Sequence, residues 1–600
     1  MCGIAGIIGG QLPASELTAG LERMRLALRN RGPDDTGTYL SPVNGAALAH
    51  TRLAILDLTA AGHQPMLSRD GRHVIVFNGE IYNHAALRQE LEAAGERFES
   101  RSDTEVILAM YRRHGPACVH ELEGMFAFCI WDEFERTAFL ARDPFGIKPF
   151  YYHAAGGTLA FASEVRALLA SGLMPRRPCR EAVFSYWLFG TVQAPLTIVE
   201  DIHCLPAGHY ARWSNGESQL RRYWEPQILG EGITDENAVS ATRAALVESV
   251  QRHLVSDVPV GIFLSGGADS TALAALAKKA RAGEIQTFCI SFDDPALSEG
   301  GAAARTAQHL GTRHHEWKMD APTGRALLAD FLQASDQPSI DGFNTYCVSR
   351  FARDRGLKVV LSGLGGDELF GGYGSFQLVP RLVRAGRRAS LVPFAPVLVG
   401  RALEALAISP RMNRLGHYLT DRPSEAGAYW CGRGIFTPAE ATQLVHHFLG
   451  GSGEPNQDES RHFVVPRQPS LEDTVSYLEL TRYMRNQLLR DSDVMSMASG
   501  LELRVPFVDR KLFEVLRQIP AVTRLAPGKA LLLRAVPEIP GWVAQAPKRG
   551  FVFPFEQWIA AEWGGVFQRL KDTSPVPLRT WYQCWCVHAL EQCLTRLGLR

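Results

Sequence analysis

The chain of 600 residues carries 63 basic and 63 acidic side chains, so its formal net charge is zero. This balance gives no reason to expect a nucleic-acid partner or attachment to a charged membrane surface. With 46% hydrophobic and 21% charged residues, the composition is that of a globular chain large enough for two or more domains. No apolar run has the length of a membrane span and no export signal begins the chain, so we expect no membrane attachment and a cytoplasmic protein.

The chain begins with Met1-Cys2-Gly3-Ile4. If Met1 is removed, the thiol of Cys2 lies beside a free α-amine, whose pKa is about 8. Such an amine can accept the thiol proton near neutral pH, so a single residue would supply both the nucleophile and the base. A buried cysteine in a first strand is the alternative interpretation.

Several polar motifs follow the first strand, and each lies at a predicted turn or element end. In chain order they are the turn Arg31–Asp34 (RGPD), His50–Leu53 at the head of a strand, Phe77–Asn83 (FNGEIYN) after the apolar strand Val74–Val76, and Ser102–Glu105, which caps a helix through Tyr111.

Together with Gly124–Phe128 and Ala141–Gly146, these motifs resemble class II (Ntn-type) glutamine amidotransferases, most closely the glutaminase domain of asparagine synthetases, over residues 2–210. The resemblance implies an N-terminal α+β sandwich of the Ntn-hydrolase type. It implies that Cys2 attacks the glutamine amide, while Asn78 and the N–H of Gly79 form the oxyanion hole.

The resemblance also assigns the glutamine-binding residues. Arg52 would pair with the α-carboxylate of glutamine, because a guanidinium matches a carboxylate in geometry. Glu80 and Asp103 would hold the α-amino group. A surface ion pair is the alternative for Arg52 and Asp103.

Breaker residues mark the end of this half. Asn215-Gly216, Pro226 and Gly230–Gly232 predict a linker, which we place at residues 211–237, before a second domain at 238–600.

The second domain opens with a strand, a glycine-rich turn and a helix. Val258–Leu264 is the strand, Ser265–Ser270 (SGGADS) the turn, and Thr271–Ala280 the helix. This arrangement can bind phosphate, because the first N–H groups of a helix have no partner inside it. Ser265 and Ser270 add hydroxyl groups, and Asp269 can hold a divalent cation. The sequence contains no Walker motif, and a tight connection without a ligand is the alternative.

Alternation of strands and helices continues along the chain. The strand Thr287–Phe292, the helix from Ser298 to Leu310 and the strand Leu357–Leu361 predict a parallel α/β sheet with ligands at the carboxyl ends of its strands. The last strand leads into Ser362–Tyr373 (SGLGGDELFGGY), a second glycine-rich turn that can face the same ligand.

SGGADS resembles the PP-loop of ATP pyrophosphatases, and residues 238–560 resemble the synthetase domain of asparagine synthetases, an α/β fold related to adenine nucleotide alpha hydrolases. The resemblance implies ATP as a substrate and Mg²⁺ held by Asp269 and Asp367. The implied ATP-binding residues are Leu264, Ser265, Gly266, Gly267, Asp269, Ser270, Ser291, Ser362, Gly363 and Lys548. Arg504 lies in another family motif, and a structural pairing with Glu502 or Asp509 is the alternative.

Residues 376–472 match the family poorly. Their helical runs with Gly and Pro breaks predict a helical insertion with a mobile loop at Gly450–Gly453. Four arginines inside it predict a solvated helix face: Arg381, Arg384, Arg387 and Arg388.

Eleven cysteines without an export signal predict reduced thiols. Near the end of the chain, Cys584, Cys586, His588 and Cys593 could suggest zinc, but their spacing is not a common zinc pattern. Tryptophans recur there at helical intervals, so a buried helix is the better interpretation.

The motifs favour an ATP- and glutamine-dependent amidotransferase, with asparagine synthetase first. Glutamine would be hydrolysed at Cys2, and ammonia would pass through an internal channel to an acyl-adenylate, β-aspartyl-AMP for aspartate. Leu364 departs from the family pattern SGEGxDE, which carries an acid there. The same chemistry on another acid, such as a sugar acid or a natural-product acid, is therefore the first alternative. A binding or regulatory protein without turnover is the second. The sequence leaves the oligomeric state open, a homodimer included.

Overall fold

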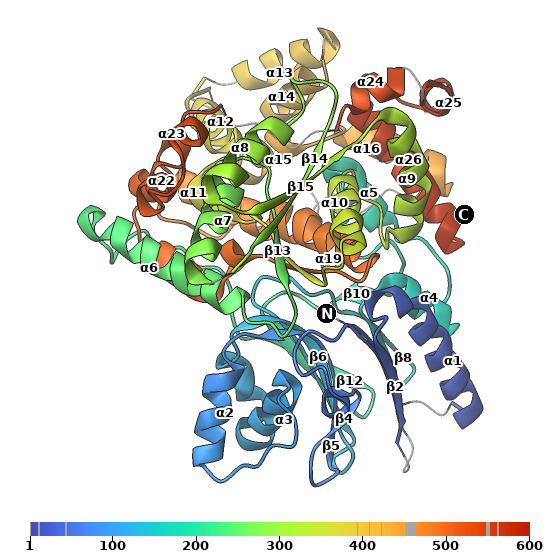
Figure 1. The fold of residues 1–600 in the computed structure, drawn as a ribbon. Coiled ribbons are helices and arrows are strands. Elements are labelled where there is room, and N and C mark those ends of the chain that lie inside the picture. Colours follow the sequence, from blue (N-terminus) through green and yellow to red (C-terminus); the bar gives the residue numbers. More distant parts are fainter. Residues whose placement is uncertain are drawn as a thin grey trace.

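Two antiparallel sheets and one parallel sheet organise the computed structural model of the chain, in which a β-rich first half lies against a largely helical second half (Figure 1). The structure describes residues 2–9, 12–41, 45–281, 283–389, 391–392, 394–406, 409–421, 423–451, 453, 463–547, 553–560 and 563–599. Among these residues, no helix combines the length and the apolar character that crossing a bilayer requires.

The first half is an α+β sandwich, as the sequence predicts. Its strands are β1 (Gly3–Gly9), β2 (Asp35–Leu40), β3 (Ala46–Arg52), β4 (Met66–Leu67), β5 (His73–Ile81), β6 (Gly124–Asp132), β7 (Thr137–Arg142), β8 (Tyr151–Ala155), β9 (Thr158–Ala162), β10 (His203–Cys204), β11 (His209–Ser214) and β12 (Glu217–Arg222). Its helices are α1 (Ala14–Ala27), α2 (His84–Ala93), α3 (Asp103–His114), α4 (Val165–Ser171) and α5 (Arg180–Phe189).

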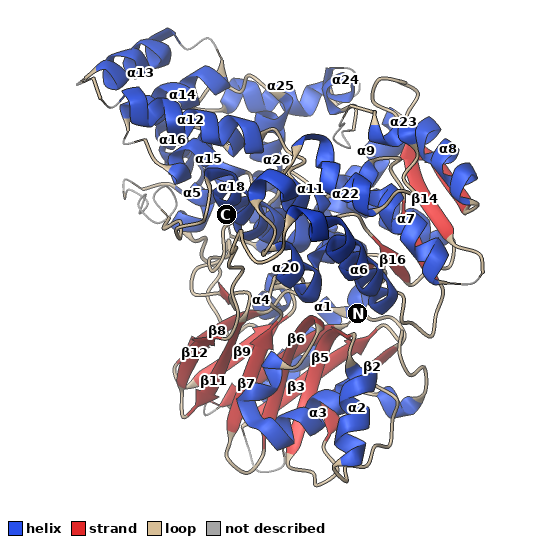
Figure 2. Cartoon of the chain, turned by 90° about the vertical axis from the view of Figure 1, so that its left-hand side faces the viewer, coloured by secondary structure: helices blue, strands red, loops and turns tan. Residues whose placement is uncertain are grey.

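The strands form two sheets in the orders β10-β8-β9-β1-β3-β2 and β12-β11-β7-β6-β5-β4. Alternate apolar side chains such as Ile4, Leu48 and Val76 fill the space between the sheets. Helices α1 and α4 cover the outer face of the first sheet, and α2 and α3 cover that of the second (Figure 2). The boundary placed at residue 210 falls inside β11, so the second sheet continues to Arg222.

The FNGE motif lies inside a strand. The sequence predicts that Phe77–Asn83 follows a strand at Val74–Val76, but β5 runs from His73 to Ile81 and includes Asn78, Gly79 and Glu80. Its partner β6 pairs with β5 along this whole length. The prediction of Ser102 as a helix cap is confirmed, because its hydroxyl accepts a hydrogen bond from the N–H of Thr104.

The second half contains the predicted parallel sheet, in the order β15-β14-β13-β16-β17. Its strands are β13 (Val260–Phe263), β14 (Gln286–Ser291), β15 (Arg313–Lys318), β16 (Val359–Leu361) and β17 (Glu502–Arg504). The helices around it are α6 (Asp235–His253), α7 (Ala268–Ala280), α8 (Gly300–Leu310), α9 (Ala321–Ala334), α10 (Phe343–Asp354), α11 (Gly366–Phe370), α20 (Arg510–Leu516), α21 (Ala521–Arg524), α22 (Ala530–Ala535) and α23 (Gly541–Ala544).

Two predicted bounds in this half are wrong by a few residues. Helix α7 begins at Ala268, inside the SGGADS motif, whereas the sequence places its start at Thr271. Helix α8 begins at Gly300 rather than Ser298.

The predicted insertion at residues 376–472 is helical in the part that the structure describes. Its helices are α12 (Ser375–Ala389), α13 (Ala395–Leu406), α14 (Pro410–Thr420), α15 (Glu425–Arg433), α16 (Pro438–Leu449) and the start of α18 (Leu471–Leu478). All four arginines predicted for a solvated face of α12 are exposed. Ser452, in the predicted mobile loop, lies outside the described residues.

A long helix and a C-terminal bundle complete the second half. Helix α18 continues through π-helical turns at Glu479–Leu489 into α19 (Arg490–Met497). The last helices are α24 (Phe555–Ala560), α25 (Gly564–Thr573) and α26 (Trp581–Leu597). Cys584, Cys586 and Cys593 lie buried on α26, and the described residues contain no cluster of three or more metal-ligating side chains, so the buried-helix interpretation is confirmed. All eleven cysteines are free thiols.

Candidate active site

Cys2 lies at the entry to β1, beside the FNGE segment of β5. Its N–H donates to Oδ1 of Asn78 at 3.0 Å. Asn78 is fully buried, and its Nδ2 has no hydrogen-bond partner in the described part of the chain. A buried amide donor beside a nucleophile is the feature that an oxyanion hole requires. Burial raises the pKa of the Cys2 thiol, so the thiol needs a base to ionise.

At position 79 of β5 there is room only for glycine. Its φ is +157°, and a Cβ at this position would lie 2.1 Å from the carbonyl oxygen of Met125 in β6. The close approach keeps the backbone of residues 78 and 79 fixed next to Cys2.

Arg52, Glu80 and Asp103, which are predicted to bind glutamine, are all buried around this point, and each has a partner within the protein. Arg52 donates from Nη1 to the carbonyl of Thr59 at 3.0 Å and from Nη2 to two further carbonyls. Glu80 forms an ion pair with Arg504 at 3.1 Å. Oδ2 of Asp103 accepts the N–H of Ile81 at 2.9 Å. Burial raises the pKa of both Glu80 and Asp103.

Arg504 makes the structural pairing with Glu502 that the sequence gives as the alternative, and its contacts extend across the two domains. Its guanidinium is fully buried and binds Glu502 of its own strand at 2.5 Å as well as Glu80 of the first domain. Asp509 binds Arg252 instead.

Arg31 makes a second buried contact between the domains. It donates from Nε to the carbonyl oxygen of Cys2 at 3.0 Å, and it binds Glu164 at 3.0 Å and Asp493 of α19 at 2.8 Å. The sequence shows Arg31 only as part of a turn. Its partner is 462 positions further along the chain, so no local pattern reveals the contact.

The phosphate-binding turn has the predicted form. The Ser265 and Ser270 hydroxyls lie 3.0 Å apart, and the N–H of Gly267 donates to Ser265 Oγ at 3.3 Å. Gly266 has φ +79° and lies so close to α8 that a Cβ would be 2.9 Å from Ala302. The start of α7 therefore follows a tightly packed turn, and the first turn of a helix is a place where phosphate can bind.

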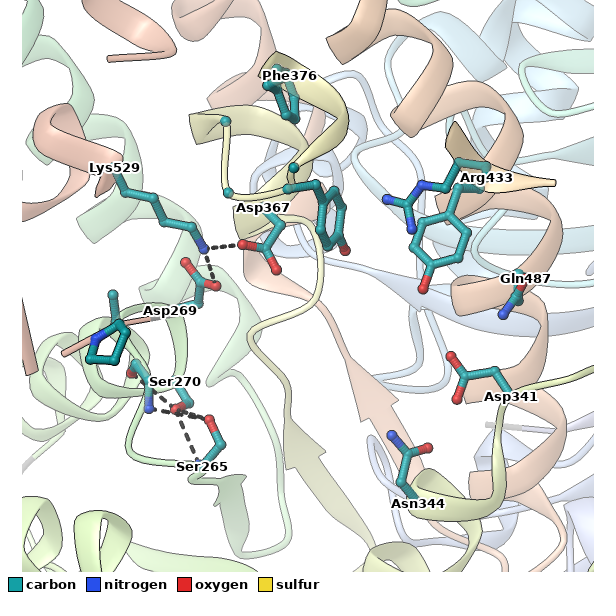
Figure 3. Close-up of a pocket in the computed structure, with 18 of the residues that line it drawn as sticks. Ser265, Asp269, Ser270, Asp341, Asn344, Asp367, Phe376, Arg433, Gln487 and Lys529 are labelled. Atoms are coloured by element: carbon teal, nitrogen blue, oxygen red, sulfur yellow. Dashed lines mark hydrogen bonds and ion pairs between the residues drawn. The ribbon is translucent and has the colours of Figure 1, made fainter. Parts of the chain in front are cut away.

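Lys529 joins the two glycine-rich turns. Its Nζ lies 2.5 Å from Asp269 of the first turn and 2.5 Å from Asp367 of the second (Figure 3). Burial opposes its charge, but Asp269 and then Asp367 outweigh that effect and raise the pKa of Lys529. Lys529 has φ +58°, an uncommon conformation for a residue with a side chain.

A cavity of about 1220 Å³ opens in front of these groups. One wall carries Ser265, Asp269, Ser270, Asp367 and Lys529, and the other carries Asp341, Asn344, Arg433 and Gln487 (Figure 3). Phe189, Thr191 and Gln193 of the first domain also line it. The cavity therefore has a phosphate-binding side, a second polar side and a border formed by the glutaminase half.

The second polar side is held by the long helix with the π-helical turns, which supplies Arg482, Tyr483 and Gln487. Arg433 stacks on Tyr483, with 3.8 Å from guanidinium carbon to ring centre, and is paired with the buried Glu479 at 2.8 Å. Burial raises the pKa of Asp341, whose carboxylate lies in the lining.

Not every predicted ATP-binding residue reaches the cavity. Of that set, the described residues in the lining are Ser265, Gly266, Gly267, Asp269 and Ser270. Leu264, Ser291, Ser362 and Gly363 are absent from the lining, and Gly363 packs against the backbone of Ser270. Lys548 lies outside the described residues. Leu364 packs against the apolar core of the synthetase half and is also absent from the lining.

A cysteine beside a buried amide donor in one domain, and a glycine-rich turn with a shared cavity in the other, are the features of a glutamine-dependent amidotransferase coupled to an ATP-using synthetase. Comparisons with known proteins agree. Residues 1–224 match the glutamine amidotransferase domain family, and residues 241–596 match the asparagine synthase family.

Relatives cover most of the chain. Glutamine-hydrolysing asparagine synthetase 1 of Bacillus subtilis is 32% identical over 94% of this chain and 88% of its own length. Asparagine synthetase B of Escherichia coli is 36% identical over 63% of this chain and 66% of its own length. Amidase chyE of Penicillium rubens is 28% identical over 83% of this chain and 77% of its own length. The chain belongs to the glutamine-hydrolysing asparagine synthetase family.

Replacement of Asn78 by alanine tests the oxyanion hole. We expect Asn78→Ala to lower kcat for glutamine hydrolysis by about 10²–10³, the usual effect of losing one oxyanion donor. Glutamate release measures this. Pyrophosphate release with ammonium as nitrogen donor should stay near the wild-type rate, and equal losses in both assays would contradict a local role.

Replacement of Lys529 by methionine tests the synthetase site. Lys529→Met keeps the length of the side chain but removes the cation that binds both Asp269 and Asp367, so we expect pyrophosphate release to fall by about 10²–10³. Lys279→Met is the matched control, because Lys279 also binds a carboxylate, Glu538 at 2.5 Å, on the surface. Wild-type pyrophosphate release by Lys529→Met would remove this lysine from the site.

Proposed function

We propose that this chain is an asparagine synthetase, which transfers the amide nitrogen of glutamine to the side-chain carboxylate of aspartate at the expense of ATP. The observation that carries the proposal is the cavity itself. The PP-loop and Lys529 line one space together with Phe189, Thr191 and Gln193 of the glutaminase half, so an activated acid and incoming ammonia can meet there.

The first step takes place at Cys2. With Met1 removed, the α-amine accepts the thiol proton and the thiolate attacks the amide carbon of glutamine. Nδ2 of Asn78 and the N–H of Gly79 stabilise the oxyanion that develops. Ammonia leaves, and water then hydrolyses the thioester to glutamate. Arg52 and Asp103 are the proposed contacts for the α-carboxylate and the α-amino group of glutamine. Glu80 forms an ion pair with Arg504 of the second domain.

The second step takes place in the cavity. The acceptor carboxylate attacks the α-phosphorus of ATP, and pyrophosphate leaves toward the PP-loop. Ammonia then attacks the acyl-adenylate and displaces AMP. Ser265, Ser270 and the first N–H groups of α7 bind phosphate oxygens, and Lys529 neutralises charge that develops on the leaving group.

Asp269 and Asp367 suit Mg²⁺, because two carboxylates together with phosphate oxygens are a ligand set that this ion prefers. When bound, the ion would neutralise phosphate charge. Lys529 holds both carboxylates at the same point, so the chain's own cation keeps them together.

Leu364 bears on the choice of acceptor. Of its acidic neighbours, Asp367 is bound to Lys529, and the buried Glu368 accepts the hydroxyl of Tyr373 at 2.8 Å. Asp341 on the opposite wall is a further acid in the lining. We propose that the carboxylate of Asp341 takes the role of the acidic side chain that the family pattern carries at position 364. The alternative acceptor, another carboxylic acid, is favoured by the similarity to the chyE amidase.

Cys2→Ala separates the two activities. We expect this variant to lose glutamine-dependent product and to keep ammonia-dependent product, because nucleophile and PP-loop lie in different domains. Product formation with glutamine or with ammonium chloride measures both. A folded variant that ammonium does not rescue would contradict the two-site mechanism.

The same product assay, run with wild-type protein and a series of carboxylic acids, identifies the acceptor. No asparagine from aspartate, with glutamate still released, would reject the asparagine synthetase proposal.

Leu364→Glu tests whether an acid is needed at this position. Because Leu364 packs against apolar core residues and Asp341 already lines the cavity, we expect no acceleration and a loss of stability of about 1–3 kcal/mol. Thermal unfolding and asparagine formation measure the two effects, with Leu364→Met as the control for packing. A faster rate than wild type would show that the missing acid limits turnover.

A further inference from the structure

Helix α13 and the segment before it expose an unusual amount of apolar surface. Leu391 is 81% exposed, Phe394 79% and Leu398 67%. Seven of the 18 exposed large apolar side chains in the described parts of the chain fall between residues 378 and 406. We name as the α13 patch Leu391, Val392, Phe394, Leu398, Val399 and Leu406. Scattered apolar residues need no explanation, but a contiguous group of this kind marks an interaction surface.

The exposed apolar side of α13 is separate from the side that packs against the rest of the protein. Leu398, Val399 and Leu406 are spaced so that they lie on one side of α13. The opposite side packs against α14 through two glycines, since a Cβ at Gly400 would lie 2.6 Å from the carbonyl oxygen of Gly416. The helix is therefore already anchored, and the patch is additional to the surface that folding uses.

Positive charge surrounds the patch. In a chain of zero net charge, residues 377–414 contain seven arginines and a single acid, Glu404. Arg384 and Arg387 have ion-pair partners, Glu472 and Glu425. Arg388, three residues before the patch, and Arg401, on α13 itself, are exposed and have no ion-pair partner within the described residues. The surface thus combines apolar side chains with unpaired cations.

The zero net charge of the whole chain predicts no membrane partner, but the local charge of this surface differs from that average, and we propose that the α13 patch docks on an anionic lipid bilayer. An apolar helix face bordered by arginine is the pattern of helices that lie in the membrane interface, where the apolar residues enter the acyl boundary and the cations meet lipid phosphates. A second copy of the chain fits less well, because a two-fold interface would place this arginine-rich surface against itself.

The position of α13 in the molecule also supports a lipid bilayer as the partner. Helices α13 and α14 form an outer corner of the molecule in both views (Figures 1 and 2). A projecting corner can enter a fluid surface without a complementary groove. Phe376 and Gln377, at the start of α12, line the cavity, and α12 leads from there to the patch. At 1.5 Å per residue, its 15 residues would separate the cavity from the lipid headgroups by about 20 Å.

Vesicle flotation with the full-length protein tests the proposal. We expect binding to vesicles of phosphatidylcholine with 30% phosphatidylglycerol, and far less to phosphatidylcholine alone. Phe394→Ser should weaken partitioning about 10-fold, and Arg388→Ser with Arg401→Ser about 20-fold on anionic vesicles only. Phe134→Ser is the matched control, because Phe134 is an equally exposed phenylalanine (84%) in the first domain and should bind like wild type.

Glutaminase activity and thermal unfolding of each variant confirm that it is folded, since none of these side chains lies in either site. Binding that is equal on neutral and anionic vesicles, or that Phe394→Ser and Phe134→Ser reduce equally, would overturn the proposal. Sedimentation velocity without lipid adds a separate test. A dimer that Phe394→Ser dissociates would assign the patch to a second copy and would also overturn membrane docking.

Discussion

Buried charge between the two domains is the constraint on which the rest of the structure depends. Arg31 and Arg504 are both fully buried, and each binds acids from both halves of the chain. Breaking such a pair by removing one partner typically costs about 3–5 kcal/mol, because an uncompensated charge stays behind. The domains therefore cannot slide over each other without exposing or isolating these groups. The nucleophile and the ATP-binding turns keep a fixed relation for the same reason.

The two sides of the cavity have different roles, and both depend on the fixed position of the domains. The phosphate side is built from turns that follow parallel strands, where such folds bind their ligands. The opposite side is built by a helix that contains π-helical turns, a local irregularity often found at functional sites. The first domain closes one border of the cavity through Phe189, Thr191 and Gln193.

The parts of the site that the sequence predicts are those whose chemistry is local. Cys2, Asn78, Gly79 and the SGGADS turn each carry their signal within a few residues, and the strand and helix types around them were also predictable. Lys529 was not, because its partner Asp269 is 260 positions away and the surrounding Gly-Lys-Ala segment has no pattern of its own. The sequence instead points to Lys548, whose role stays a prediction. The sequence predicts that the FNGE motif follows its strand. The motif lies inside β5 because pairing with β6 extends this strand, and such pairing is a long-range effect.

The hydrogen bond from Arg31 to the carbonyl oxygen of Cys2 bears on whether the two domains can be exchanged separately in evolution. The same guanidinium binds Glu164 of the first domain and Asp493 of α19, so this buried cation has one counter-charge in each domain. A glutaminase module of this kind joined to a foreign synthetase without an acid at that place would lose one of the two acids that pair with this buried cation. The two halves are therefore expected to be inherited and recombined as a pair, so new acceptor specificities would arise inside the cavity rather than by exchange of domains.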